Sequence, residues 1–164
     1  MPTLRNATEA DVPLILRFIR ELAEYERLAH ACIATEESVR ETLFGEKRYA
    51  EVILAEHDGE PAGFALFFHN YSTFLARPGI YLEDLYVRPE LRGYGIGKAL
   101  LARLAALAVE RNCGRVEWAV LNWNEPAIRF YRSLGALPQD QWTVYRVTGE
   151  ALEHLSRFDA TSGS

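Results

Sequence analysis

The 164-residue sequence lacks several features that mark specialised protein classes. Cys32 and Cys113 are its only cysteines and no C-x-x-C pair occurs, which argues against a disulfide framework and a structural zinc site. No apolar run approaches the ~20 residues that a membrane-spanning helix needs. The first residues show neither the basic region nor the apolar stretch of a signal peptide. We therefore expect a cytoplasmic protein without membrane contact.

An excess of positive charge is also missing. The 18 Lys and Arg residues are outnumbered by 23 Asp and Glu residues, for a net charge of −5. This balance disfavours a nucleic-acid partner, which a basic face would attract, and is compatible with a cationic substrate. The 4 histidines show no metal-ligand spacing, so we expect no metal.

Strand and helix patterns run through the whole chain. Expected strands cover residues 3–7, 49–56, 61–70, 80–87, 114–122 and 142–147. Expected helices cover residues 8–26, 35–44, 125–134 and the stretch from a glycine loop to about 112, followed by a short C-terminal helix and a polar tail from about 159. This order predicts one mixed α/β domain over residues 1–164, in which an antiparallel meander leads into a parallel crossover.

Local start and stop signals support these elements. Thr8 is the expected N-cap of the first helix, with Asp11 completing an acidic capping box. Asn124 is the expected N-cap of the helix that Gly135 ends. The pair Asp58-Gly59 predicts a tight hairpin turn.

The glycine loop reads R-G-Y-G-I-G-K over residues 92–98, between a strand and a helix. Backbone N–H groups and the helix dipole favour an anion at such a junction. A Walker A loop is excluded, because Arg92 stands where a glycine is needed and Ala99 follows Lys98. A dinucleotide fingerprint fails too, because its third glycine would fall on Lys98 or Leu100. What remains is Arg-x-x-Gly-x-Gly, with an ordinary strand–helix junction as the alternative.

Glu83 and Asp84 are adjacent carboxylates in a strand otherwise built of Tyr, Leu and Val. Successive strand residues point to opposite faces, so we expect the two to have different roles. A buried charge is costly unless a cation pairs with it, and an amine substrate would supply one. The alternative is a solvated polar step in an edge strand.

The Arg-x-x-Gly-x-Gly pattern resembles the acetyl-coenzyme A loop of the GCN5-related N-acetyltransferases (GNAT superfamily). Three further stretches, Y-L-E-D, W-N-E-P-A-I-R-F-Y and E-L-A-E-Y-E-R-L, are similar to its diamine (spermidine/spermine) and thialysine acetyltransferase branch. The resemblance runs from about Thr3 to Phe158. It implies a GNAT-like single domain with a central mixed sheet of about six or seven strands flanked by helices, and, by analogy, a homodimer.

The same resemblance implies an acetyl-coenzyme A-dependent N-acetyltransferase. Its acceptor would be the primary amine of a small cation (a diamine, polyamine or lysine-like amino acid) that attacks directly in a ternary complex. After Tyr25 and Glu26 the chain has fewer acidic residues than polyamine enzymes of the branch, so a shorter amine fits equally well. The alternatives are an acetyltransferase of peptide or protein amines and a non-catalytic acyl-coenzyme A sensor.

The chemistry sets three demands. An ammonium, with a pKa near ~10.4, must lose a proton, the carbonyl oxygen needs a donor, and a thiolate with a pKa near ~8.5 leaves better when protonated. The resemblance implies that Glu83 is the base, Asp84 a second amine contact, and Tyr131 the acid, with a half-buried core tyrosine as the alternative for Tyr131. It further implies that the cosubstrate is bound by Leu85, Val87, Arg92, Gly93, Gly95, Ile96, Gly97, Lys98, Asn124 and Tyr131. The implied amine site consists of Tyr25, Glu26, Glu83, Asp84, Asp140 and Trp142.

Overall fold

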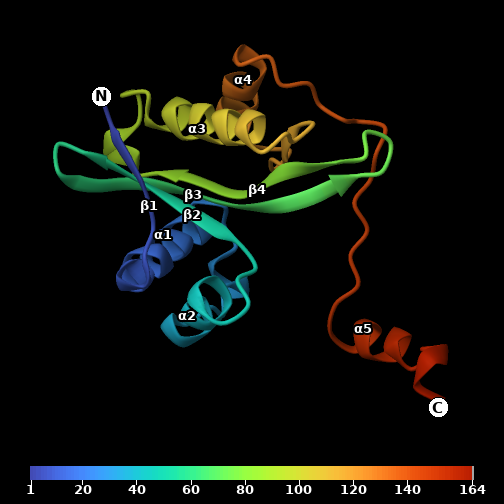
Figure 1. The fold of residues 1–164 in the computed structure, drawn as a ribbon. Coiled ribbons are helices and arrows are strands. Elements are labelled where there is room, and N and C mark those ends of the chain that lie inside the picture. Colours follow the sequence, from blue (N-terminus) through green and yellow to red (C-terminus); the bar gives the residue numbers. More distant parts are fainter. Residues whose placement is uncertain (164) are drawn as a thin grey trace. The chain divides into compact units, whose positions relative to one another are not determined.

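A computed structural model describes residues 1–163 of the chain (Figure 1). Ser164, the end of the predicted polar tail, lies outside the described residues. The chain falls into two compact units, Met1–Leu121 and the part that begins at Asn122, and each unit is described by itself. That the two form one domain stays a prediction.

The first unit is built on a single five-stranded sheet with the order β1-β2-β3-β4-β5. Its strands are β1 (Thr3–Asn6), β2 (Glu51–His57), β3 (Glu60–Ser72), β4 (Arg77–Val87) and β5 (Val116–Trp118). The first four strands pair antiparallel in chain order, and β5 pairs parallel with β4. Parallel pairing requires a crossover, which the chain between β4 and β5 supplies. The mixed sheet confirms the predicted fold class.

Three α-helices cover the sheet. They are α1 (Val12–Tyr25), α2 (Glu36–Phe44) and α3 (Ile96–Glu110). Short 3-10 turns occur at Glu9–Asp11, Ala29–Ala31 and Pro89–Leu91. Figure 1 shows α1 and α2 on one face of the sheet and α3, the crossover helix, on the other. None of the helices described is long and apolar enough to cross a membrane.

The local signals in the sequence are confirmed where they can be checked. The Thr8 N–H donates to Asp11 Oδ2 at 2.7 Å, which is half of the predicted capping box. Asp58 and Gly59 have φ angles of 51° and 79°, and two positive φ angles are what the tightest hairpin turn requires.

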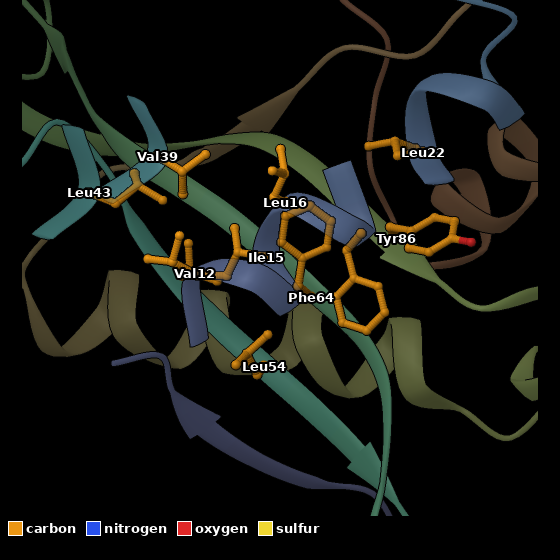
Figure 2. Packing of buried hydrophobic residues seen from close by; sticks show 11 residues of the cluster. Val12, Ile15, Leu16, Leu22, Val39, Leu43, Leu54, Phe64 and Tyr86 are labelled. Carbon is orange, nitrogen blue, oxygen red and sulfur yellow. The ribbon is translucent and has the colours of Figure 1, made fainter. Parts of the chain in front are cut away.

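An aromatic contact lies at the centre of the core between the sheet and α1 (Figure 2). The Phe18 ring lies 5.7 Å from the Phe64 ring and 5.9 Å from the Tyr86 ring, measured between centroids. Buried aliphatic residues of α1, α2 and β2 surround the contact, among them Val12, Ile15, Leu16, Leu22, Val39, Leu43, Val52 and Leu54. The strand that carries Tyr86 is therefore fixed against α1 by close packing.

The other face of the sheet is covered by α3, which contacts β2, β3 and β4. Its buried residues Ile96, Leu100 and Leu104 recur at every fourth position, and Leu107 continues this stripe. Because Ile96 is the first residue of α3 and only 1% exposed, the glycine loop in front of it is anchored to the sheet.

The second unit contains α4 (Glu125–Ser133), α5 (Gly149–Ser156) and a 3-10 turn (Ala160–Gly163). The predicted strand over residues 142–147 is wrong, because this stretch forms no helix or strand. Its Val144 and Tyr145 are 85% and 92% exposed. Alternating apolar residues make a strand only where a neighbouring strand accepts their hydrogen bonds, and the described residues provide none here. The sheet therefore has five strands, fewer than the six or seven expected.

Candidate active site

Strand β4 contains a β-bulge at Glu83. Leu82 pairs with Phe67 and Asp84 pairs with Leu66, so Glu83 is one extra residue without a partner on β3. Leu66 packs against the α1-side core, so its partner Asp84 belongs to the same face of the sheet. A bulge interrupts the simple alternation of side chains. The rule of alternating faces, on which the expectation for Glu83 and Asp84 rested, therefore does not hold at this pair.

The bulge brings together three carboxylates: Glu83 and Asp84 from β4 and Glu26 from the end of α1. Burial, followed by the negative charges of Glu83 and Glu26, raises the pKa of Asp84 to about 7. Burial and the charge of Glu83 also raise the pKa of Glu26. Asp84 feels the charges of both glutamates and Glu26 feels that of Glu83, so we treat the three as one group, the carboxylate cluster.

The described residues provide no ion pair for the carboxylate cluster. Within residues 1–163, neither Glu26, Glu83 nor Asp84 forms an ion pair with a Lys, Arg or His side chain. Partly buried carboxylates without a cation are unfavourable for folding, and they are common where a protein binds a charged ligand. The arrangement suits a positively charged group that arrives from solution, where Glu83 is exposed. Across the described chain, no group of three or more His, Cys, Asp or Glu residues is arranged to hold a metal ion.

Beyond the carboxylate cluster, one side of β4 has no strand partner. The parallel pairing with β5 covers only Ile80 to Leu82. Among the described residues, 84–87 pair with β3 alone, so the side of β4 that faces β5 further back is an open strand edge here. An open edge can accept an extended ligand as a further strand. Leu85 and Val87, which the resemblance assigns to the cosubstrate, both lie on this stretch.

The glycine loop follows the open edge. Gly93 and Gly95 have φ angles of 90° and 79°, which residues with a Cβ rarely adopt. Gly95 is also the N-cap of α3. None of the N–H groups of residues 93–98 donates a hydrogen bond to an acceptor within residues 1–163. These N–H groups lie at the N-terminal end of a 15-residue helix, and they suit the anion that the sequence predicts at this junction.

Arg92 directly precedes these N–H groups in the sequence. Its Nε donates to the Val87 carbonyl oxygen at 3.0 Å, and its guanidinium lies over the Tyr25 ring at 4.7 Å from the centroid. Tyr25 thus lies beside the loop, although the sequence placed it in the amine site. Glu26 follows Tyr25 directly. The end of α1 therefore lies beside both the glycine loop and the carboxylate cluster.

The remaining predicted residues belong to the second unit. Asn124 is 7% exposed and caps α4, where its Oδ1 accepts from the Ala127 N–H at 3.4 Å, as predicted for an N-cap. Tyr131 is half-buried on the same helix, with its ring 5.6 Å from the Phe130 ring. Asp140 is exposed and Trp142 is 80% exposed, and both lie outside any helix or strand. Their roles stay predictions.

The sequence reasoning missed the bulge and the link between Tyr25 and Arg92. Neither has a local signal, because one depends on the register of β4 against β3 and the other on the packing of α1 beside the loop. The two adjacent carboxylates in an apolar strand were the available signal for the bulge, since bulges often aim side chains at a site.

Comparisons with known proteins bear on the family and the fold of this chain. The family model that matches is the acetyltransferase (GNAT) family, over residues 17–136. The thialysine N-epsilon-acetyltransferase of Bos taurus is 40% identical, in an alignment that covers 93% of this chain and 96% of the bovine protein. The L-ornithine N5-acetyltransferase of Arabidopsis thaliana is 33% identical, over 95% of this chain and 88% of the plant protein. Among solved structures, an integron cassette protein from the mobile metagenome of V. cholerae is similar with a TM-score of 0.81 and 26% identity, over 95% of this chain and 98% of that protein.

Proposed function

Because the chain belongs to the acetyltransferase (GNAT) family and is an enzyme of the N-acetyltransferase class, we propose that it acetylates the primary amine of a small cation with acetyl-coenzyme A. The observation that carries the acceptor half of this proposal is the carboxylate cluster, which no cation of residues 1–163 neutralises. The donor half is supported by the glycine loop, whose N–H groups and Arg92 suit a pyrophosphate.

The carboxylate cluster would bind the ammonium group and receive its proton. An alkylammonium with a pKa near ~10.4 is held by negative charge and must then lose a proton to become a nucleophile. Glu83, the predicted base, is the exposed member of the cluster, so it can pass a proton on to solvent. Asp84, with its pKa raised to about 7, can hold a proton at neutral pH. We propose that Glu83 accepts the proton and that Asp84 contacts the amine and shares the charge.

Acetyl-coenzyme A would supply the acetyl group as a thioester. Arg92 and the N–H groups of residues 93–98 would hold its pyrophosphate, and the open edge beside Leu85 and Val87 would hold its extended arm. We propose that the amine attacks the thioester directly within a ternary complex, as the resemblance implies. Asn124 is proposed to contact the donor near the thioester, on the resemblance.

Tyr131 is proposed to protonate the leaving thiolate. Tyr131 is half-buried on α4, and a phenol carries its proton at neutral pH and can donate it to a departing thiolate. Tyr131→Phe removes only the hydroxyl group. We expect turnover to fall by about 10²–10⁴-fold, with coenzyme A affinity nearly unchanged. Turnover equal to that of the wild type would remove Tyr131 from this role.

The acceptor is proposed to be a lysine-like amino acid or a diamine. Thialysine and ornithine are the amines named for two relatives, and both carry an amine on a flexible chain. A thiol-release assay with thialysine, ornithine, lysine, putrescine, spermidine and a lysine peptide tests this proposal. We expect thialysine and ornithine to give the highest kcat/KM. A preference for the peptide would favour the protein-amine alternative, and coenzyme A binding without thiol release for any amine would favour the sensor.

A homodimer in the cytoplasm completes the proposal. Val144 and Tyr145 are almost fully exposed, and apolar side chains of this size favour burial against a partner. Light scattering coupled to size exclusion tests the dimer, and fractionation of the source cells tests the location.

A further inference from the structure

The contact between Arg92 and Tyr25 gives the tyrosine a role that the resemblance did not assign. The guanidinium is held from two directions, by the Val87 carbonyl oxygen that accepts from Nε at 3.0 Å and by the Tyr25 ring at 4.7 Å. Neither terminal nitrogen of Arg92 makes a hydrogen bond or ion pair within residues 1–163. The nitrogens that bind phosphate best are thus left for a ligand, while the rest of the side chain is fixed.

Tyr25 owes its own position to the way in which α1 ends. It is the last residue of the helix, and the chain turns sharply after it, with Arg27 in the left-handed region at a φ of 61°. The Leu28 N–H donates to the Ala23 carbonyl oxygen at 2.8 Å, and the Arg27 N–H donates to the Glu24 carbonyl oxygen at 3.0 Å. These two bonds close the Schellman motif, which fixes the last helical turn. The Tyr25 ring is therefore presented from a closed helix end and not from a loop.

We propose that Tyr25 is a positioning residue for Arg92, which it holds ready for the pyrophosphate of the donor, and not a contact of the amine. This inference rests on the proposed binding of acetyl-coenzyme A. An exposed arginine on a glycine loop must lose side-chain freedom when it binds an anion, and a stacked ring removes part of that cost beforehand. The aromatic face carries the effect, so the tyrosine hydroxyl group is not needed for it.

The test is a calorimetric titration of the full chain with coenzyme A at fixed ionic strength. Tyr25→Phe keeps the aromatic face and should bind coenzyme A like the wild type. Tyr25→Leu keeps apolar bulk but loses the face, and should bind about twofold to fivefold more weakly, as expected for an exposed cation–π contact. Tyr49→Leu is the matched control, because Tyr49 also lies in the first unit and has a cation, Lys47, at 5.1 Å from its ring centroid. It should leave the affinity unchanged.

A double-mutant cycle shows whether Tyr25 acts through Arg92. In an Arg92→Ala background, Tyr25→Leu should cause no further loss. Arg92→Lys keeps the charge and loses the planar face, so it should weaken binding by itself and reduce the effect of Tyr25→Leu. Circular dichroism shows whether Tyr25→Leu disturbs the fold. If it does, the Arg92 variants still test the contact from its other side, with Tyr25 in place.

The outcomes separate the inference from the function on which it rests. If the wild type fails to bind coenzyme A, the proposed function fails, and this inference fails with it. If the wild type binds coenzyme A but Tyr25→Leu binds equally well, only the inference is overturned. The same holds if Tyr25→Leu weakens binding by the same factor with and without Arg92. If Tyr25→Leu raised the KM of the amine in the thiol-release assay and left the affinity for coenzyme A unchanged, Tyr25 would belong to the amine site.

Discussion

Asp84→Asn should stabilise the protein at alkaline pH, although it changes a residue of the proposed site. The substitution keeps the shape of the side chain and removes its charge. In the folded chain, burial and the charges of Glu83 and Glu26 raise the pKa of Asp84 from 3.8 to about 7. The folded protein therefore disfavours the ionised carboxylate that the unfolded chain accepts freely.

The sign and size of the effect follow from linkage. Below pH 4 Asp84 is protonated in both states, and its contribution to the free energy of unfolding is fully present. As the pH rises from 4 toward 7, the unfolded chain has released the proton while the folded chain still holds it, so the contribution falls and is lost once the pH passes 7. The pKa difference is about 3 pH units, and at 1.36 kcal/mol per unit the loss is at most about 4 kcal/mol.

Urea unfolding at pH 4, 6 and 8 measures this difference. The free energy of unfolding of Asp84→Asn, minus that of the wild type, should grow from pH 4 to pH 8 by at most about 4 kcal/mol. Glu60→Gln, an exposed carboxyl at the β2–β3 hairpin, is the control and should show no such growth. A difference that stays constant over this pH range would refute the electrostatic reasoning. Acetyl transfer should fall in the stabilised variant, because the charge that costs stability is the one proposed to bind the amine.

Two further predictions concern stability away from the site. Arg5 lowers the pKa of Asp11 to about 2, so Asp11→Asn should reduce the free energy of unfolding by about 1–2 kcal/mol at pH 7. That loss should disappear as the pH falls from 4 to 2, and a loss that persists at pH 2 in urea unfolding would count against the ion pair. Ala76 has a φ of 51°, so Ala76→Gly should raise the unfolding midpoint by an amount equivalent to about 0.5–1 kcal/mol. The matched control Ala106→Gly, on the exposed face of α3, should lower the unfolding midpoint by an amount equivalent to about 1 kcal/mol. If both variants shifted the midpoint of thermal unfolding in the same direction, the assignment of backbone strain at Ala76 would be contradicted.

Local chemistry explains what the sequence could predict. The capping box of Thr8 and Asp11, the N-cap at Asn124 and the hairpin at Asp58-Gly59 depend on residues at most three positions apart. The glycine loop is equally local, since its conformation follows from glycines at the positions with positive φ. Such features can be predicted from the sequence because their geometry does not depend on the position of a distant segment.

The type of sheet could be predicted, but the register and extent of strand pairing could not. The rule of alternating faces placed Glu83 and Asp84 on opposite sides, but the register of β4 against β3 inserts Glu83 as an extra residue. The stretch from 142 to 147 has the composition of a strand but no neighbouring strand in the described chain. In both cases the composition suits a strand, and the geometry depends on whether and how a neighbouring strand pairs with it.

The bulge at Glu83 also has an evolutionary consequence. All pairs of β4 with β3 before and after it are in regular register, and they differ by this single residue. Deletion of Glu83 would therefore merge the two registers into one continuous ladder without moving any other pair. One in-frame codon loss would abolish the proposed base and leave the sheet intact. Descendants that retain this fold but have lost the chemistry would be one mutational step away, and a missing residue between Leu82 and Asp84 would identify them in a genome.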